Sequence, residues 1–127
     1  MAVKIENIEN STIIRITHSG KVSLDQRVNV VHQICVDHHN DSTLLKLLID
    51  ARLVTNVMTE AEQDVFGSYI ASRPELEKAF VAVIANPKQV LNQIVLKKSS
   101  LLGHNIMLFE IEAEALEWLN NASSELL

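Results

Sequence analysis

Two short alternating segments near the N-terminus predict a pair of β-strands. Val3 and Ile5 alternate with polar residues, and Ile14 and Ile16 do the same. The polar run 9–11 between them is typical of a turn. Because successive side chains of a strand point to opposite faces, this alternation separates an apolar face from a polar one. The pattern predicts an antiparallel hairpin with one face toward water.

Two capping boxes mark the starts of helices. Ser23 is followed three residues later by Gln26, and Thr59 by Glu62. In this arrangement the two side chains satisfy backbone N–H groups that the first helical turn leaves unpaired. The first box predicts a helix over 24–38, and the second predicts one that continues to about residue 72, where Arg73-Pro74 ends it.

Apolar residues recur at spacings of three and four in both predicted helices, which gives each a stripe that can lie on a sheet. In the first helix the stripe consists of Leu24, Val28, Val31, Ile34, Cys35 and His38. In the second helix it consists of Ala61, Val65, Phe66, Tyr69 and Ile70.

Three later segments, 44–50, 80–86 and 106–109, predict strands. The last two are apolar on both alternating faces, which is typical of central strands covered by helices. Asn86-Pro87 supplies an N-cap and a first helical residue for a third helix that ends at Gly103. A last helix is predicted over 112–120, with Ala115, Leu116 and Leu119 facing inward.

The alternation of strands and helices predicts an α/β fold in one domain over 1–127. We expect a mixed, mostly parallel sheet of about five strands, flanked by about four helices. The last three strands are expected to run parallel through right-handed crossovers, and the N-terminal hairpin extends the sheet in the antiparallel sense.

Composition narrows the classes of partner. Hydrophobic residues make up 47% of the chain and aromatic residues 4%, so the core is expected to consist mainly of aliphatic side chains. The net charge of −5 opposes binding to a phosphate backbone, and we expect no nucleic-acid partner.

Cys35 is the single cysteine and is expected to be a small buried hydrophobe. We expect a cytoplasmic protein with no secretory signal and no membrane span.

Three places in the sequence resemble a known family. Leu48-Ile49-Asp50-Ala51-Arg52 ends a predicted central strand, and 80–85 is a strand of mostly small apolar residues. In the C-terminal segment, Phe109 is followed by Ala115, Leu116, Trp118 and Leu119. Together they resemble the SpoIIAA-like branch of the STAS superfamily. These small bacterial proteins are related in fold to anti-sigma-factor antagonists and, more distantly, to CRAL-TRIO lipid-binding domains.

The resemblance implies a regulatory, non-enzymatic module with a switch region after the central strand. In the antagonists a serine follows that strand and is phosphorylated by a kinase partner. Here no serine follows Asp50-Ala51-Arg52, and Thr55 and Thr59 are the nearest hydroxyls. This departure argues against a phosphorylation switch in this chain.

The rim beyond the carboxyl ends of the parallel strands is the predicted site, because open α/β sheets bind ligands there. Helix N-termini and the planar fork of Arg52 suit an anion or a peptide, so we expect a protein partner. The alternative is that Thr59 and Asn86 only cap helices and that Asp50 pairs with Arg52 or a loop amide. The rim consists of Asp50, Arg52, Thr55, Thr59 and Asn86, with Asn56, Lys88 and Glu110 beside them.

Metal, cofactor and catalytic sites are not predicted. His38 and His39 are adjacent on one helical turn and therefore point about 100° apart, which makes them poor ligands for one ion. The chain has no Gly-x-Ser-x-Gly elbow and no phosphate-binding glycine loop. We therefore expect no enzymatic activity.

Two further interpretations stay open. An apolar small molecule could occupy a CRAL-TRIO-like cavity under a movable helix. Self-association as a homodimer could use an exposed apolar patch at Trp118, Leu126 and Leu127. The residues that would line the cavity are Leu91, Ile94, Val95, Leu101, Leu102 and Met107.

Overall fold

The N-terminal hairpin forms as the alternation predicts. The computed structural model describes residues 2–9, 11–38, 45–85 and 105–122. Strand β1 (Ala2–Asn7) pairs antiparallel with β2 (Ile13–Gly20), and Ile5 lies opposite Ile16. The Ser11 hydroxyl stabilises the turn, because it donates to the Ile8 carbonyl and accepts from the Ile13 N–H.

The described strands form one five-stranded sheet in the order β1-β2-β3-β4-β5. Strands β3 (Lys46–Val54), β4 (Phe80–Ile84) and β5 (Asn105–Phe109) run parallel, as predicted. Strand β2 also runs parallel to β3, so only β1 is antiparallel. Of the two hairpin strands, β1 is therefore antiparallel to the rest of the sheet and β2 is parallel to it. The parallel pairing of β2 and β3 is possible because a helix connects them.

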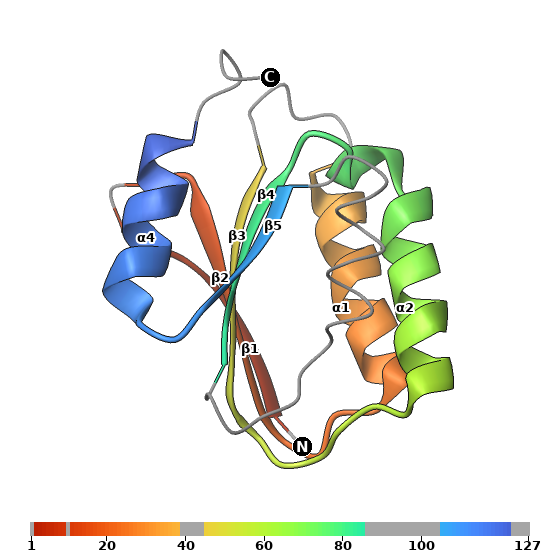
Figure 1. Ribbon diagram of the computed structural model, residues 1–127. Helices are drawn as coiled ribbons and strands as arrows, with labels where there is room; N and C mark the ends of the chain where they lie inside the picture. The colour runs from red at the N-terminus through yellow and green to blue at the C-terminus, as the bar shows by residue number, and fades with distance from the viewer. Residues whose placement is uncertain (1, 10, 39–44, 86–104, 123–127) are drawn as a thin grey trace.

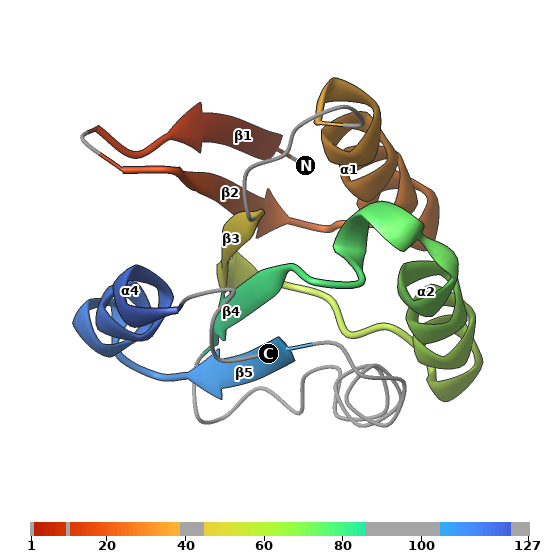
Figure 2. The same ribbon diagram turned by 90° about the horizontal axis from the view of Figure 1, so that it is seen from above.

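Helices cover the two faces of the sheet (Figure 1). Helices α1 (Leu24–Asp37) and α2 (Glu60–Ser72) lie side by side on one face, and α4 (Glu112–Asn121) lies on the other (Figure 2). Both predicted capping boxes are confirmed, at Ser23 and at Thr59. A short 3-10 helix, η1 (Pro74–Leu76), follows the end of α2. The predicted third helix lies outside the described residues.

Each face has its own core. Beneath α1 and α2 the core contains Ile14, Ile16, Leu47, Val81 and Val83 from the sheet, and Val30, Val31, Ile34 and Cys35 from α1. Beneath α4 it contains Ile13, Leu48, Phe80, Ala82 and Ile84, with Ala115 and Leu119. Alternate residues of β3 and β4 thus enter different cores, which explains why these strands are apolar on both faces.

Three expectations about the strands were wrong. The predicted strand 44–50 is longer and ends at Val54, so Asp50 and Arg52 lie within it. The polar face of the hairpin is only partly exposed to water, because Arg15 of β2 is mostly buried there and pairs with Glu112 of α4. Strand β5 lies at an edge of the described sheet, not at its centre, and Met107 and Leu108 are exposed.

The buried stripes of the helices also differ from the prediction. Arg27 and Val30 lie on the buried face of α1, where Leu24 and Val28 were expected, and both of those are half-buried. In α2, Ala61 and Val65 are exposed, whereas Phe66, Tyr69 and Ile70 pack against the core.

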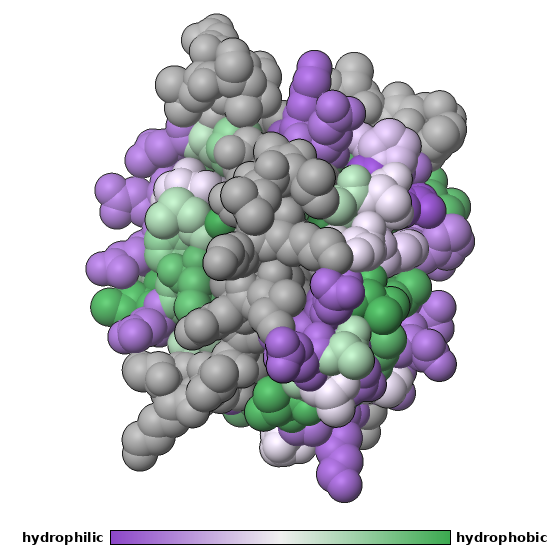
Figure 3. All heavy atoms as spheres, turned by 45° about the vertical axis from the view of Figure 1, so that its right-hand side comes forward, coloured by the Kyte–Doolittle hydropathy of each residue, from purple (hydrophilic) through white to green (hydrophobic). Residues whose placement is uncertain are grey.

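The C-terminal aromatic residue is part of the core rather than a surface patch. Trp118 is half-buried, and its ring centroid lies 5.6 Å from that of Phe80 and 5.8 Å from that of Phe109. The two terminal leucines lie outside the described residues. On the side of the molecule shown in Figure 3, small hydrophobic areas lie among hydrophilic side chains. Self-association stays a prediction without support from Trp118.

Candidate functional site

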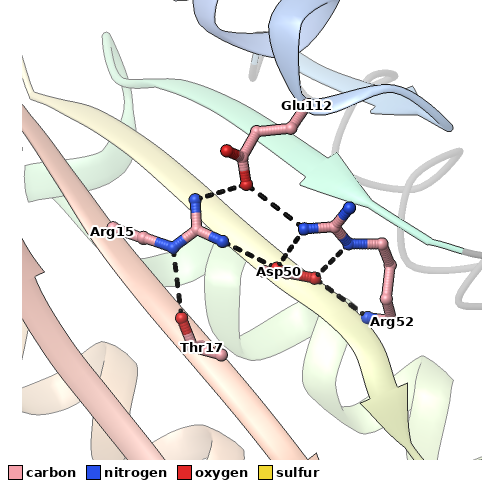
Figure 4. Close-up of polar contacts among 5 residues, drawn as sticks. All are labelled: Arg15, Thr17, Asp50, Arg52 and Glu112. Atoms are coloured by element: carbon pink, nitrogen blue, oxygen red, sulfur yellow. Dashed lines mark hydrogen bonds and ion pairs between the residues drawn. The ribbon is translucent and has the colours of Figure 1, made fainter.

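Four charged side chains meet between the sheet and the start of α4 (Figure 4). We call Arg15, Asp50, Arg52 and Glu112 the charge cluster. Arg15 Nη2 donates to Asp50 Oδ2 at 2.7 Å, and Arg15 Nη1 lies 2.6 Å from Glu112 Oε1. Arg52 Nη2 bridges the same two carboxylates, at 2.7 Å from Asp50 Oδ2 and 3.2 Å from Glu112 Oε1. Each cation thus contacts both anions.

Burial within the charge cluster is graded. The Asp50 side chain is 6% exposed and that of Arg15 is 19% exposed. Arg52 and Glu112 are 38% and 37% exposed. The buried side of the cluster therefore anchors α4 to the sheet, whereas Arg52 and Glu112 present one positive and one negative group to solvent.

An irregular strand pairing positions Arg52. Thr17 pairs with Asp50, but the next paired position, Ser19, lies opposite Leu53, so β3 has one more residue than β2 between these pairs. The Arg52 N–H is turned to Asp50 Oδ1 at 3.1 Å. A bulge of this kind redirects side chains, and here it lets Arg52 reach back to the carboxylate two residues earlier.

The charges of the cluster stabilise the ionised form of Asp50. Burial by itself would raise the pKa of the Asp50 carboxyl, but the hydrogen bonds from Arg52 and the charges of Arg52 and Arg15 outweigh it. The pKa of Asp50 therefore lies below its ordinary value. The hydrogen bond to Asp50 correspondingly raises the pKa of Arg52. Asp50 is an anion at neutral pH and is poorly suited to accept a proton in catalysis.

The predicted rim residues do not form one group. Asp50 and Arg52 are paired, as the alternative interpretation proposed. Thr55 is exposed just beyond β3, where its N–H donates to the Gly20 carbonyl. Thr59 caps α2 through a hydrogen bond from the Glu62 N–H at 3.1 Å. Asn86 lies outside the described residues.

Asn56, which the sequence also placed at the rim, joins the two loops that precede the helices. Its Oδ1 accepts from the Val22 N–H at 2.7 Å, and its Nδ2 donates to the Val22 carbonyl at 2.9 Å. Since Val22 is fully buried, this pair of hydrogen bonds fixes the loop before α1 against the loop before α2.

Sequence reasoning missed Arg15 and Glu112. Arg15 belongs to an alternating strand, where its type and spacing suited a solvated face. Glu112 stands at the start of a helix, where an acidic residue is favoured by the helix dipole alone. Their partners are distant in sequence, so only the fold brings them together.

No protein-family model and no curated protein matches this chain. Among solved structures, the chain is similar to an uncharacterized protein of the DUF3478 family from Shewanella loihica PV-4, which has a SpoIIAA-like fold. The TM-score is 0.60 over 93% of this chain and 92% of the other, at 18% sequence identity. The chain has a SpoIIAA-like fold. The fold expected from the resemblance is thus confirmed.

This SpoIIAA-like fold contains an apolar pocket between the sheet and the pair α1 and α2. Its volume is about 70 Å³. Ile106 and Leu108 of β5 line it, whereas Met107, the one described member of the predicted cavity lining, is not among the lining residues. The rest of the lining includes Ile16, Ile49, Val83, Val31, Phe66 and Ile70, and two buried polar residues, His18 and Arg27.

The remaining candidates of the sequence have structural explanations. Cys35 is fully buried, as predicted. Burial raises the pKa of its thiol, and a hydrogen bond with Arg73 opposes that rise. Across the described ranges, no group of three His, Cys, Asp or Glu side chains is arranged to hold a metal ion. Within the same ranges, no helix is both long and apolar enough to cross a membrane.

Proposed function

We propose that this chain is a non-enzymatic protein-interaction module of a regulatory kind. The SpoIIAA-like fold supports this proposal through the family resemblance. The charge cluster supports the non-enzymatic part of the proposal, because each of its cations is already paired with carboxylates. We expect the module to act in the cytoplasm, since its buried free cysteine suits a reducing compartment.

The observation that carries the proposal is the exposed side of the charge cluster next to an exposed apolar side chain. Leu53 follows Arg52 directly and is 62% exposed. Because Leu53 pairs with Ser19, and Asp50 with Thr17, the side chains of Leu53 and Asp50 belong to the same face of the sheet. An arginine beside an exposed aliphatic group is a usual composition for an interface.

The partner in this proposal contacts Arg52, Glu112 and Leu53, with the exposed Thr55 hydroxyl at the margin. Thr59, which caps α2, is not part of this surface, and Asn86 stays a prediction from the sequence. The partner needs a carboxylate or carbonyl group for Arg52 and an apolar side chain for Leu53. Asp50 supports this surface from beneath, because it fixes the direction of the Arg52 guanidinium.

Quantitative affinity capture from the native cell tests the proposal, with the wild type and Leu53→Ser as baits. Val36→Ser is the matched control, because Val36 is 53% exposed and lies near the end of α1. The captured partner is then purified and titrated against the wild type, Leu53→Ser, Arg52→Ala and Val36→Ser. We expect Leu53→Ser and Arg52→Ala to weaken binding at least about ten-fold, and Val36→Ser to leave it unchanged. Equal affinity of all forms would remove this surface from the proposal.

A second candidate function is the binding of an apolar small molecule, and the pocket under α1 and α2 favours it. Its lining is aliphatic and aromatic apart from His18 and Arg27. Native mass spectrometry of protein purified from its own cells tests this function. A bound species of reproducible mass is the expected result. An unliganded mass, together with no binding of 1-butanol added to the protein, would contradict it.

A further inference from the structure

A buried cation lies at the polar end of the apolar pocket. Arg27 is 5% exposed, and it lines the pocket together with His18, which is equally buried. No described residue offers a hydrogen-bond partner to Arg27 Nε, Arg27 Nη2 or His18 Nδ1. Arginine retains its charge in proteins, and a buried charge without a partner is strongly unfavourable. The wall of the pocket therefore contains buried donors that have no partner among the described residues.

The two unpaired nitrogens of Arg27, Nε and Nη2, form the edge of the guanidinium group that commonly binds a carboxylate. Nε and Nη2 of Arg52 donate to the two oxygens of Asp50, at 3.0 and 2.7 Å. The same two nitrogens of Arg27 are unpartnered and buried beside apolar walls. Two parallel N–H donors match the spacing of carboxylate oxygens. His18 adds a third donor when the proton is on Nδ1.

The surroundings of Arg27 favour an anion further. Arg27 belongs to the first turns of α1, and the N-terminus of α2 begins at the same edge of the sheet. Helix N-termini carry partial positive charge. The acidic residues of these turns, Asp25, Glu60 and Glu62, are exposed or half-buried. Glu62 Oε1 accepts from the Thr59 N–H, and the charge of Glu62 partly offsets the effect of burial on the pKa of Arg27. Among the described residues, Arg27 forms no ion pair.

We propose that the pocket binds a small aliphatic carboxylic acid as its anion, with the carboxylate on Arg27 and His18 and the tail among Val31, Ile49 and Phe66. A volume of about 70 Å³ has room for about five to seven non-hydrogen atoms. The tail is accordingly short. This inference rests on the second candidate function and adds the charge and class of the ligand to it.

The test compares butanoate, 1-butanol and butylammonium at pH 7, by calorimetric titration and by amide chemical shifts. These probes share a tail and differ in head group. Butanoate is expected to bind about ten-fold or more tightly than 1-butanol, and butylammonium not at all. The largest shifts are expected at the amides of His18, Arg27 and Ala51, because these residues line the pocket.

Arg27→Met is the decisive variant, because it keeps the apolar stem and removes the fork. It is expected to bind butanoate no better than 1-butanol. Arg27→Lys keeps the charge without the paired donors, and it is expected to lose most of the preference for the carboxylate over the alcohol. This variant keeps the test decisive if Arg27→Met does not fold. Lys21→Met is the matched control, since Lys21 is an exposed cation near the same helix and its loss should leave the preference intact.

The outcomes distinguish failure of the carboxylate inference from failure of the second candidate function, the binding of an apolar small molecule. Equal binding of butanoate and 1-butanol to the wild type would overturn the carboxylate inference and leave an apolar pocket. Binding of neither would overturn both. A carboxylate preference that Arg27→Met retains would also overturn the assignment of the anion to Arg27.

Discussion

Asp50 accepts hydrogen bonds from the backbone N–H, Nε and Nη2 of Arg52, which lies only two residues later in the same strand. In a regular strand, residues two apart project side by side, and the backbone N–H of the second is committed to the ladder. The extra residue in β3 releases that N–H and directs it to the carboxylate. The bulge and the ion pair therefore depend on each other.

Removal of Asp50 is expected to destabilise the protein much more than removal of Arg52. Asp50→Ala leaves the mostly buried Arg15 and the half-exposed Arg52 without their shared carboxylate, which costs about 3 kcal/mol or more in the free energy of unfolding. Arg52→Ala leaves Asp50 paired with Arg15 and costs about 1 kcal/mol. Urea denaturation measures both changes.

The exposed pair of Lys4 and Glu6 is the control for this comparison, with 3.7 Å between its charged atoms. Lys4→Ala should change the unfolding free energy by no more than about 0.5 kcal/mol. Equal destabilisation by Asp50→Ala and Arg52→Ala would mean that burial does not decide the energetics of the charge cluster.

Local sequence rules predicted the elements whose stabilising contacts are local. The hairpin and the two capping boxes each depend on residues within a few positions of one another, and all three are confirmed. The extension of β3 to Val54 was missed, because the apolar run ends at Ile49 and the bulge has no distinct sequence signature. Propensity cannot show that a strand continues through Asp50 when a distant arginine satisfies its charge.

The polar end of the pocket was also missed, although part of its signal was in the sequence. Arg27 precedes Val31 by four residues and Val30 by three, so its spacing placed it on the buried stripe of α1. Its charge made a solvated position the ordinary expectation. Most of the other residues that line the pocket come from the sheet and α2, and their proximity to Arg27 follows only from the tertiary structure.

Stability is expected to fall as the pH is lowered from about 6.5 to about 4, because of His18. Burial, with a smaller effect from the charge of Arg27, lowers the pKa of His18 to about 4, against 6.5 for the ordinary group. The unfolded chain then binds a proton that the folded chain excludes. The stabilisation is complete above pH 6.5, and about 3 kcal/mol is lost on reaching pH 4.

Urea denaturation at a series of pH values measures this loss. His18→Phe should flatten the profile between pH 6.5 and 4. His32→Gln, which replaces an exposed histidine of α1, should leave the slope as in the wild type. An unchanged slope in His18→Phe would show that another group is responsible.

Loss of the Asn56 side chain is expected to loosen the connection between the loops that precede α1 and α2. Asn56→Ala removes both hydrogen bonds to the buried backbone of Val22 and is expected to cost about 2 kcal/mol. Hydrogen exchange of the Val22 amide should become faster. Gln33→Ala removes an exposed hydrogen bond to Asp37 and should have almost no effect. Unchanged protection of Val22 would contradict this role of Asn56.

Cys35 is expected to react with a disulfide reagent only when the protein opens. It is fully buried, and burial raises the pKa of its thiol, so the reactive thiolate is scarce in the folded state. When opening and closing are faster than the reaction, the rate follows the population of the open form. Asn56→Ala should therefore accelerate modification by about 30-fold, for a loss of about 2 kcal/mol.

A Cys35→Ala/Ser68→Cys variant supplies the exposed comparison, because Ser68 lies on the outer side of α2. Modification of native Cys35 as fast as that of the thiol at position 68 would show that the core beneath α1 admits the reagent without unfolding.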